Sequence, residues 1–267
     1  MDLPLTLILE LTVLGLCTGF LAGLLGLGGG MLMVPFLTMI LTARAYPPGA
    51  TVKMAVATSL ATILFTSLAS VRAHHQRGAV MWPMAALLAP GILVGAFAGS
   101  QLAAALPARL LSLLFALFVT FSATQMLLNR KPKPARTLPG APGMFGVGGM
   151  IGLLSSLVGA GGAFVSVPFM TWCNVSIHKA VGTSAALGFP IALAGTIGYL
   201  VAGWGLPQMP PGAFGYLYWP GLLVLSIASV ATAPVGARLA HRMDIAPLKK
   251  AFAIVLYCLA AYFVLRT

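Results

Sequence analysis

The chain has 267 residues, of which 60% are hydrophobic and 7% charged, and its formal net charge is +12. Soluble domains carry about 25% charged residues, so this composition excludes an ordinary soluble domain. The basic residues stand singly or in small groups between apolar runs, which is typical of membrane orientation signals and argues against nucleic-acid binding.

Four long runs contain no Asp, Glu, Lys or Arg: residues 11–43, 78–108, 137–178 and 180–237. A helix that spans a membrane needs about 20 apolar residues. The runs lack the alternation of apolar and polar residues that the strands of a membrane β-barrel show. We therefore predict an all-α polytopic membrane protein.

Ten apolar segments follow one another along the chain. They are predicted at 3–25, 30–42, 53–73, 79–105, 108–128, 144–159, 162–174, 179–202, 214–240 and 247–266. The second and seventh segments give only about 20 Å of helix, which is too short for a hydrocarbon core of about 30 Å. We expect each to form a hairpin with the segment before it, so that eight or ten segments cross the membrane.

Three sequence blocks occur twice in the same order. Residues 26–36 match 159–169 at six of eleven positions, residues 55–59 match 180–184, and Trp82-Pro83 matches Trp219-Pro220. We interpret these matches as a duplication. The predicted units are a first transmembrane repeat over 1–128, a basic, proline-rich cytoplasmic linker over 129–143 and a second transmembrane repeat over 144–267.

Five segments in each half make an odd number, so the second copy is expected to enter the membrane from the opposite side. Alternating the segments places four basic residues on the side of the amino terminus and eleven on the other. The side richer in basic residues is the cytoplasmic one. The sequence thus predicts two inverted-topology repeats, with both termini outside a bacterial inner (cytoplasmic) membrane.

The glycine blocks are the predicted substrate site. Glycine breaks at matching places in the two halves of a membrane protein point to the binding site of a transporter. A short helix follows each block, and the unpaired N–H groups at a helix N-terminus favour an anion. The alternative is close helix packing by small residues. The predicted cradle consists of Gly28, Gly29, Gly30, Gly161, Gly162 and Ala163.

Hydroxyl groups stand near each break. Thr58, Ser59, Thr183 and Ser184 are predicted to donate hydrogen bonds to the anion, although such side chains also bond to carbonyls one turn back in their own helix. The matched prolines, Pro35 and Pro168, are expected to kink or end the short helices.

Charged residues supply further candidates. Glu10 is the only acid within an apolar segment, and intramembrane acids often mark ion pathways. The candidates for coupling or for attracting anions are Glu10, Lys53, Lys179, Arg72 and Arg77, and their alternative role is to anchor helix ends. Three isolated cysteines and three acids offer no metal spacing and no catalytic arrangement, so no metal, cofactor or enzymatic activity is predicted.

These motifs resemble those of the sulfite exporter TauE/SafE family of bacterial membrane transporters over almost the whole chain. The resemblance rests on the glycine blocks ending in Val34-Pro35-Phe36 and Val167-Pro168-Phe169 and on the two Ala-Val-x-Thr-Ser blocks. It implies transport of small sulfur-containing anions such as sulfite or sulfonates. Because Ala163 replaces Gly30 in the second block, the two cradles are expected to differ.

The predicted function is secondary transport, as an exporter, of a small sulfur-containing anion by alternating access around the two breaks. The expected partners are this anion, the lipid bilayer and a proton as coupling ion. An anion channel on the same scaffold is the alternative. A membrane enzyme or a scaffold fits less well, because the chain has few acids and a scaffold needs no matched glycine breaks.

Overall fold

A computed structural model describes residues 4–25, 29–128, 137–206, 209–240 and 246–266. Within these residues the chain folds into ten α-helices and one short β-hairpin. Their bounds are α1 Leu5–Leu25, α2 Gly30–Ala43, α3 Pro48–His75, α4 Trp82–Ala105, α5 Ala108–Leu128, α6 Ala141–Val158, α7 Ala163–Trp172, α8 Ile177–Gly203, β1 Ala213–Phe214, β2 Leu217–Tyr218, α9 Trp219–Ala240 and α10 Ala246–Arg266.

Seven of the described helices are long and apolar enough to cross a membrane: α1, α3, α4, α5, α6, α8 and α9. The shorter apolar helices are α2, α7 and the part of α10 from Lys250 to Leu265. Large apolar side chains such as Leu117 and Ile227 are exposed on the outer faces, where lipid would cover them. The prediction of a polytopic all-α membrane protein is confirmed, and the number of crossings, eight or ten, stays a prediction.

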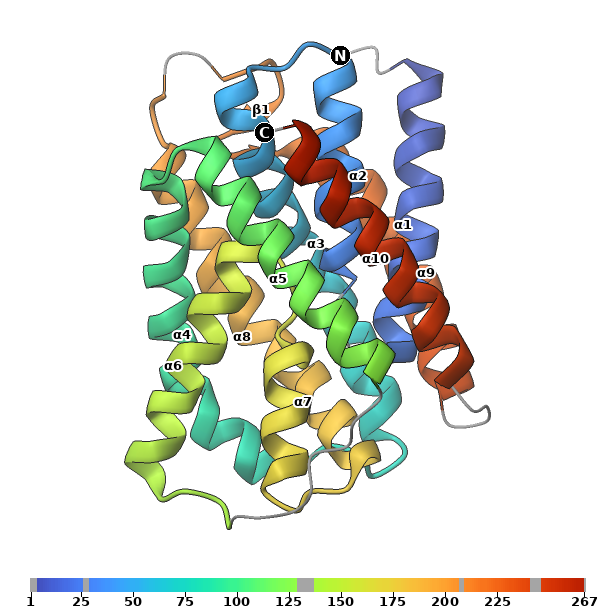
Figure 1. Ribbon diagram of the computed structural model, residues 1–267, viewed down its shortest axis with the longest axis vertical. Coiled ribbons are helices and arrows are strands. Elements are labelled where there is room, and N and C mark those ends of the chain that lie inside the picture. Colours follow the sequence, from blue (N-terminus) through green and yellow to red (C-terminus); the bar gives the residue numbers. More distant parts are fainter. Residues whose placement is uncertain (1–3, 26–28, 129–136, 207–208, 241–245, 267) are drawn as a thin grey trace.

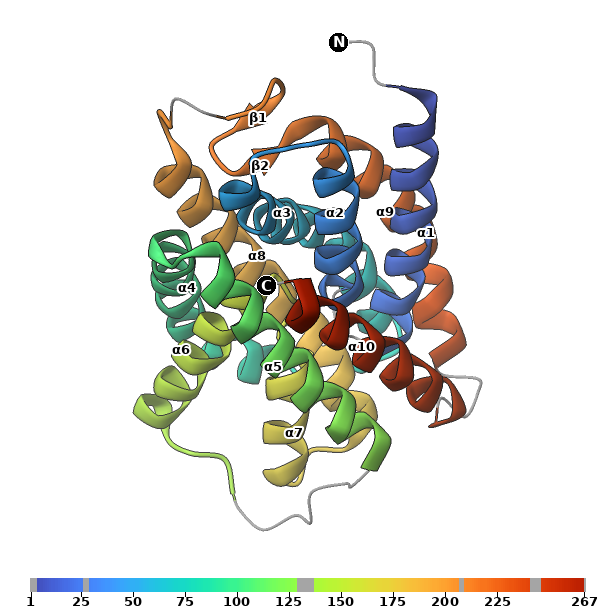
Figure 2. The same ribbon diagram turned by 45° about the horizontal axis from the view of Figure 1, so that its top comes forward.

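Helices α3 and α8 form the centre of the molecule. In the most apolar 18-residue stretch of each helix, 72% is buried in α3 and 61% in α8. The corresponding share in the other five long helices is 39–50%. Figure 2 shows α3 almost end-on, enclosed by its neighbours. The two central helices run in opposite directions, so α3 and α8 begin at opposite ends of the molecule (Figure 1).

The short helices α2 and α7 both begin near mid-height and run to opposite ends of the molecule (Figure 1). Each follows a longer helix that approaches from the end to which the short helix returns, so the pairs α1–α2 and α6–α7 form hairpins, as expected. Pro35 and Pro168 lie inside these helices. The prolines therefore do not end the helices. Each lacks the N–H group that would bond to the carbonyl four residues earlier, that of Met31 in α2 and of Phe164 in α7, so the kink that the sequence also predicts stays a prediction.

The two halves of the chain exchange their packing partners. Helix α1 of the first half packs along α9 of the second, and α4 of the first packs along α6 of the second. Glycines allow both pairs of backbones to approach closely: a Cβ on Gly19 would clash with the carbonyl oxygen of Ser229, and one on Gly152 with that of Ile92. These two contacts occupy equivalent places in the halves.

The loop before α9 differs from the prediction. Residues 214–218, expected to belong to the ninth helix, form part of a hairpin in which Ala213 pairs with Tyr218 and Phe214 with Leu217. Gly212 and Gly215 have positive φ values of 84° and 57°, which turn the chain before the helix can begin. Helix α9 starts at Trp219, and Pro220 suits its first turn.

Candidate functional site

Glycines stand immediately before both short helices, as the sequence predicts. Gly29 precedes α2 with φ 71°, and Gly162 precedes α7 with φ 79°, a left-handed conformation that other residues rarely adopt. The Gly29 carbonyl accepts from the amides of residues 32 and 33, and the Gly162 carbonyl accepts from those of residues 165 and 166. The N–H groups of the residues before these, at the start of each helix, have no carbonyl partner within the helix and point out of its end.

The two glycine blocks meet inside the protein. Gly30, the first residue of α2, lies so close to the second block that a Cβ on it would clash with the carbonyl oxygen of Gly159. The Oγ of Ser59 donates a hydrogen bond of 2.9 Å to this same carbonyl. Two predicted site residues of the first half, Gly30 and Ser59, are thus joined to the second block. Gly28 lies outside the described residues.

Thr58 and Thr183 tie the halves together. The Oγ1 of Thr58 accepts from the amide of Tyr218 at 3.0 Å, and that of Thr183 accepts from the amide of Met81 at 2.9 Å. Each amide directly precedes a Trp-Pro pair that starts a helix of the other half. Both threonines are fully buried and serve as structural acceptors. An accepting hydroxyl keeps its own proton, so the predicted donation to an anion stays a prediction for both threonines.

A narrow cavity lies between α1, α3 and α8, beside the second glycine block. Gly161 and Ser184 of the predicted site line it, together with Thr66, Ser67 and Ser70 of α3. Ser184 accepts a hydrogen bond of 2.8 Å from Ser166 in α7. The wall is therefore uncharged and rich in hydroxyl groups, among the residues that the structure describes.

The hydroxyls of α3 that line the cavity were missed by the sequence prediction. Two of them, Thr66 and Ser70, belong to a buried stripe with a spacing of four residues, formed by Thr58, Thr62, Thr66, Ser70 and His74. A spacing of four places side chains on nearly the same face of a helix. That spacing is visible in the sequence and could have indicated a polar face inside an otherwise apolar segment.

The predicted acid of the pathway lies at a helix end. Glu10 forms an ion pair of 2.9 Å with Arg44, and its side chain is 47% exposed. Arg44 caps the end of α2 opposite Gly30, about 20 Å away at 1.5 Å per residue. This pair favours anchoring of the α1–α2 hairpin over a role beside the glycine blocks.

None of the basic candidates lines the cavity. Lys53 donates to the Ala104 carbonyl at the end of α4, at 2.5 Å, and its ammonium lies over the Tyr216 ring. Arg72 and Lys179 are exposed at helix ends, and Arg77 donates to the carbonyl one turn before it. These contacts are typical of residues that stabilise helix ends.

The surroundings of the cavity show what chemistry the site offers. No group of three or more His, Cys, Asp or Glu side chains suitable for a metal occurs in the described part of the chain. Hydroxyl donors and the start of α7 remain as the recognition groups, and these suit an anion better than a cation.

Two hairpins that break inside a helical membrane protein, with an uncharged polar cavity beside their meeting point, are features of a membrane transporter. The model of the sulfite exporter TauE/SafE family matches residues 11–263. The chain belongs to this family of membrane transporters.

Curated relatives carry names of the same kind. A probable membrane transporter protein of Haemophilus influenzae is 35% identical over 256 residues, which cover 96% of this chain and 97% of the relative. The probable membrane transporter protein YdhB of Bacillus subtilis is 27% identical, with 92% and 94% covered. A relative from Methanocaldococcus jannaschii with the same description is 28% identical over 84% and 81%. No solved structure matches the chain.

Proposed function

We propose that the protein is a secondary transporter, working as an exporter, for a small sulfur-containing anion such as sulfite or a sulfonate. The observation that carries the proposal is the contact between the two glycine blocks, where Gly30 and Ser59 meet the Gly159 carbonyl beside a hydroxyl-lined cavity. Irregular backbone at membrane depth is tolerated where it is buried in protein or lines a cavity. The family's name supports a sulfur anion as the cargo.

Anion selectivity follows from the groups around the cavity. The described lining residues include no carboxylate that could hold a cation. The start of α7 contributes the positive end of a helix dipole, equivalent to about half an elementary charge. Hydroxyl groups donate hydrogen bonds, which are stronger when the acceptor is ionised. These donors fit the oxygen atoms of a sulfite or sulfonate group.

Alternating access is supported by the reciprocal contacts of the halves. Thr58 of the first half binds the start of a second-half helix, and Thr183 of the second half binds the start of a first-half helix. The exchanged pairs α1–α9 and α4–α6 repeat this reciprocity. Two halves related in this way support an inverted repeat, in which one hairpin and its partners move against the other around a fixed site.

Transport is tested with purified protein in proteoliposomes of bacterial lipids, loaded with unlabelled sulfite and exposed to radiolabelled sulfite. Saturable uptake with counterflow, above that of protein-free vesicles, is the expected result. Methanesulfonate and chloride serve as competitors that separate oxyanion recognition from general anion selectivity. A lack of uptake of any sulfite or sulfonate would refute the proposal, and large single-channel currents without counterflow would indicate an anion channel.

The coupling ion is tested in the same vesicles. An imposed pH gradient is expected to drive accumulation of sulfite, because a proton is the proposed coupling ion. A Glu10→Gln variant should retain this response, since Glu10 pairs with Arg44 at a helix end. A response that is lost in this variant alone would restore Glu10 as the coupling residue.

A further inference from the structure

Ser70 is a buried hydroxyl at the wall of the cavity. Its side chain is 4% exposed, and its Oγ has no hydrogen-bond partner among the residues that the structure describes. It lines the same cavity as Gly161 and Ser184. A buried hydroxyl without a partner destabilises the folded state, so its presence at a cavity indicates a ligand that completes it.

The neighbouring hydroxyls on α3 are already committed. The Oγ1 of Thr66 donates to the Thr62 carbonyl at 2.6 Å, and the Oγ of Ser67 donates to the Leu64 carbonyl at 3.1 Å. Ser184, across the cavity on α8, accepts from Ser166 and therefore keeps its own proton for another acceptor. Ser70 and Ser184 are thus the two donors that face the cavity from its opposite walls.

The start of α7 defines the charge of the ligand. Gly161 lines the cavity one residue before the glycine that precedes α7, so the positive end of this helix lies beside the two serines. The described lining residues carry no charged side chain. A small oxyanion satisfies the hydroxyl donors and the helix end together.

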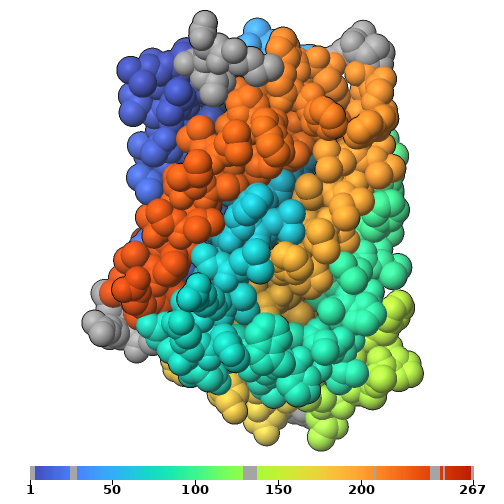
Figure 3. Space-filling view, turned by 180° about the vertical axis from the view of Figure 1, so that it is seen from behind, coloured from blue at the N-terminus to red at the C-terminus, as the bar shows by residue number. Residues whose placement is uncertain are grey.

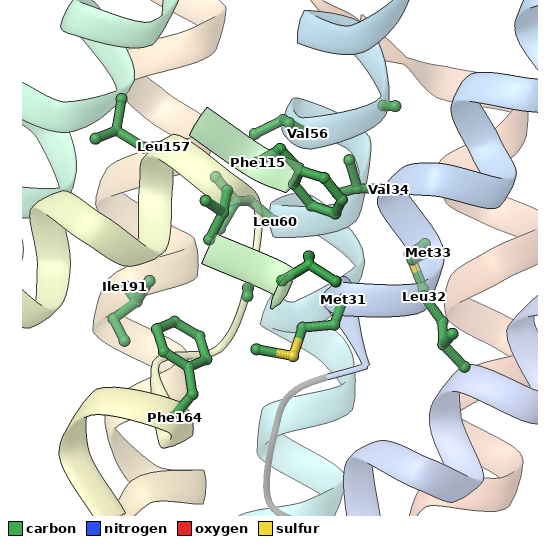
Figure 4. Close-up of a cluster of buried hydrophobic side chains, with 14 of the residues drawn as sticks. Met31, Leu32, Met33, Val34, Val56, Leu60, Phe115, Leu157, Phe164 and Ile191 are labelled. Atoms are coloured by element: carbon green, nitrogen blue, oxygen red, sulfur yellow. The ribbon is translucent and has the colours of Figure 1, made fainter. Parts of the chain in front are cut away.

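Several residues that line the cavity differ from their duplicates in the other half of the chain. The duplication pairs Ser70 with Gly195, Thr66 with Ile191 and Ala185 with Leu60. Leu60 and Ile191 are fully buried and fill the matching space, and a Cβ on Gly195 would lie 2.9 Å from Leu60 Cδ1. Figure 4 shows Leu60 and Ile191 within the central cluster of buried apolar side chains.

We propose that this cavity is a single, off-centre oxyanion site, in which the hydroxyls of Ser70 and Ser184 bind the anion beside the first turn of α7. The inference rests on the proposed function and names its binding residues. It places recognition on α3 and α8 beside the second glycine block, instead of sharing it equally between the two blocks. Figure 3 shows the carboxyl-terminal part of α3 between α8 and α9 on the back of the molecule.

Binding is measured by isothermal titration of purified, detergent-solubilised protein with sodium sulfite and with sodium methanesulfonate. Ser70→Ala is expected to weaken binding by about 10- to 100-fold, the effect of losing a hydrogen bond to an ionised group. Ser70→Thr keeps the hydroxyl and should retain most of the affinity. Ala185→Leu copies the residue that fills the matching space and should abolish binding.

Ser122→Ala is the matched control. Ser122 lies on α5, is 1% exposed, and its Oγ also has no partner among the described residues, but it does not line the cavity. Its variant should bind sulfite within about twofold of the wild type. Both Ser→Ala variants should unfold at or above the wild-type temperature, because each loses a buried hydroxyl that has no described partner.

The outcomes separate the site from the function. Selective weakening in Ser70→Ala supports the inference, and equal affinities of Ser70→Ala, Ser122→Ala and the wild type overturn it. A wild type that binds neither oxyanion also overturns it. The wild type could bind sulfite, with the variants weakened as predicted, and still fail to carry sulfite into vesicles. That result would uphold the site and refute the transporter function.

Discussion

Replacing Gly30 by alanine tests the contact between the two glycine blocks. Gly30 has no positive φ, so the variant probes space alone. The added Cβ would lie 2.9 Å from the Ala160 Cα and nearer still to the Gly159 carbonyl oxygen, and both are backbone atoms that cannot rotate away. Overpacking of this kind costs about 1–3 kcal/mol.

Two further effects enter the magnitude. Moving the Gly159 carbonyl disturbs its hydrogen bond from Ser59, which contributes about 0.5–1.5 kcal/mol. Alanine is favoured over glycine within a helix by up to about 1 kcal/mol, which offsets part of the loss. The free energy of unfolding should therefore fall by about 1–3 kcal/mol, or about 3–10 °C in the melting temperature of a protein of this size.

The assay is thermal unfolding of purified protein in detergent, together with sulfite uptake in vesicles. Gly49→Ala is the control, because no heavy atom lies within 4 Å of a Cβ built there. Its melting temperature should be unchanged or slightly higher. A Gly30→Ala protein that melts with the wild type and transports normally would refute the close contact of the two blocks.

Other substitutions separate strain, hydrogen bonding and substrate binding. Gly162→Ala should lower the free energy of unfolding by about 1–2 kcal/mol through its positive φ, and by more because a Cβ there would lie 2.6 Å from Ile191 Cδ1, measured in the same thermal assay. Thr58→Val and Thr183→Val should each lower the free energy of unfolding by about 1–3 kcal/mol, because each leaves an amide of the other half without its acceptor. Stability equal to the wild type would contradict these reciprocal contacts. Gly161→Val should abolish transport with near-normal membrane insertion, measured by uptake and by the amount of folded protein, and an equal loss of folded protein would indicate a packing role instead.

The sequence located the irregular backbone because its physical cause is local. Only glycine adopts a positive φ readily, so Gly29 and Gly162 could be placed before the short helices without knowing what surrounds them. The length of an apolar run is likewise a local property, which explains why the helices were found with small errors at their ends. The hairpin at 213–218 was missed because hydropathy alone does not distinguish a buried strand from a buried helix.

Partners across the molecule could not be predicted. The sequence did not reveal that the hydroxyls of Thr58 and Thr183 accept hydrogen bonds from amides that lie 160 and 102 residues away in the chain. Glu10 looked isolated in the sequence and is paired with Arg44. Ser70 attracted no attention, because its importance depends on the cavity that α1, α3 and α8 enclose.

The exchanged packing of α1 with α9 and of α4 with α6 has a consequence for synthesis. During translation α1 is made long before residues 219–240, which form α9. The face of α1 that packs on α9 therefore has no protein partner until almost the whole chain has been made. Neither half can complete its own core. If the two halves were made as separate fragments, the stability of the assembled protein would therefore depend on their concentration in the membrane.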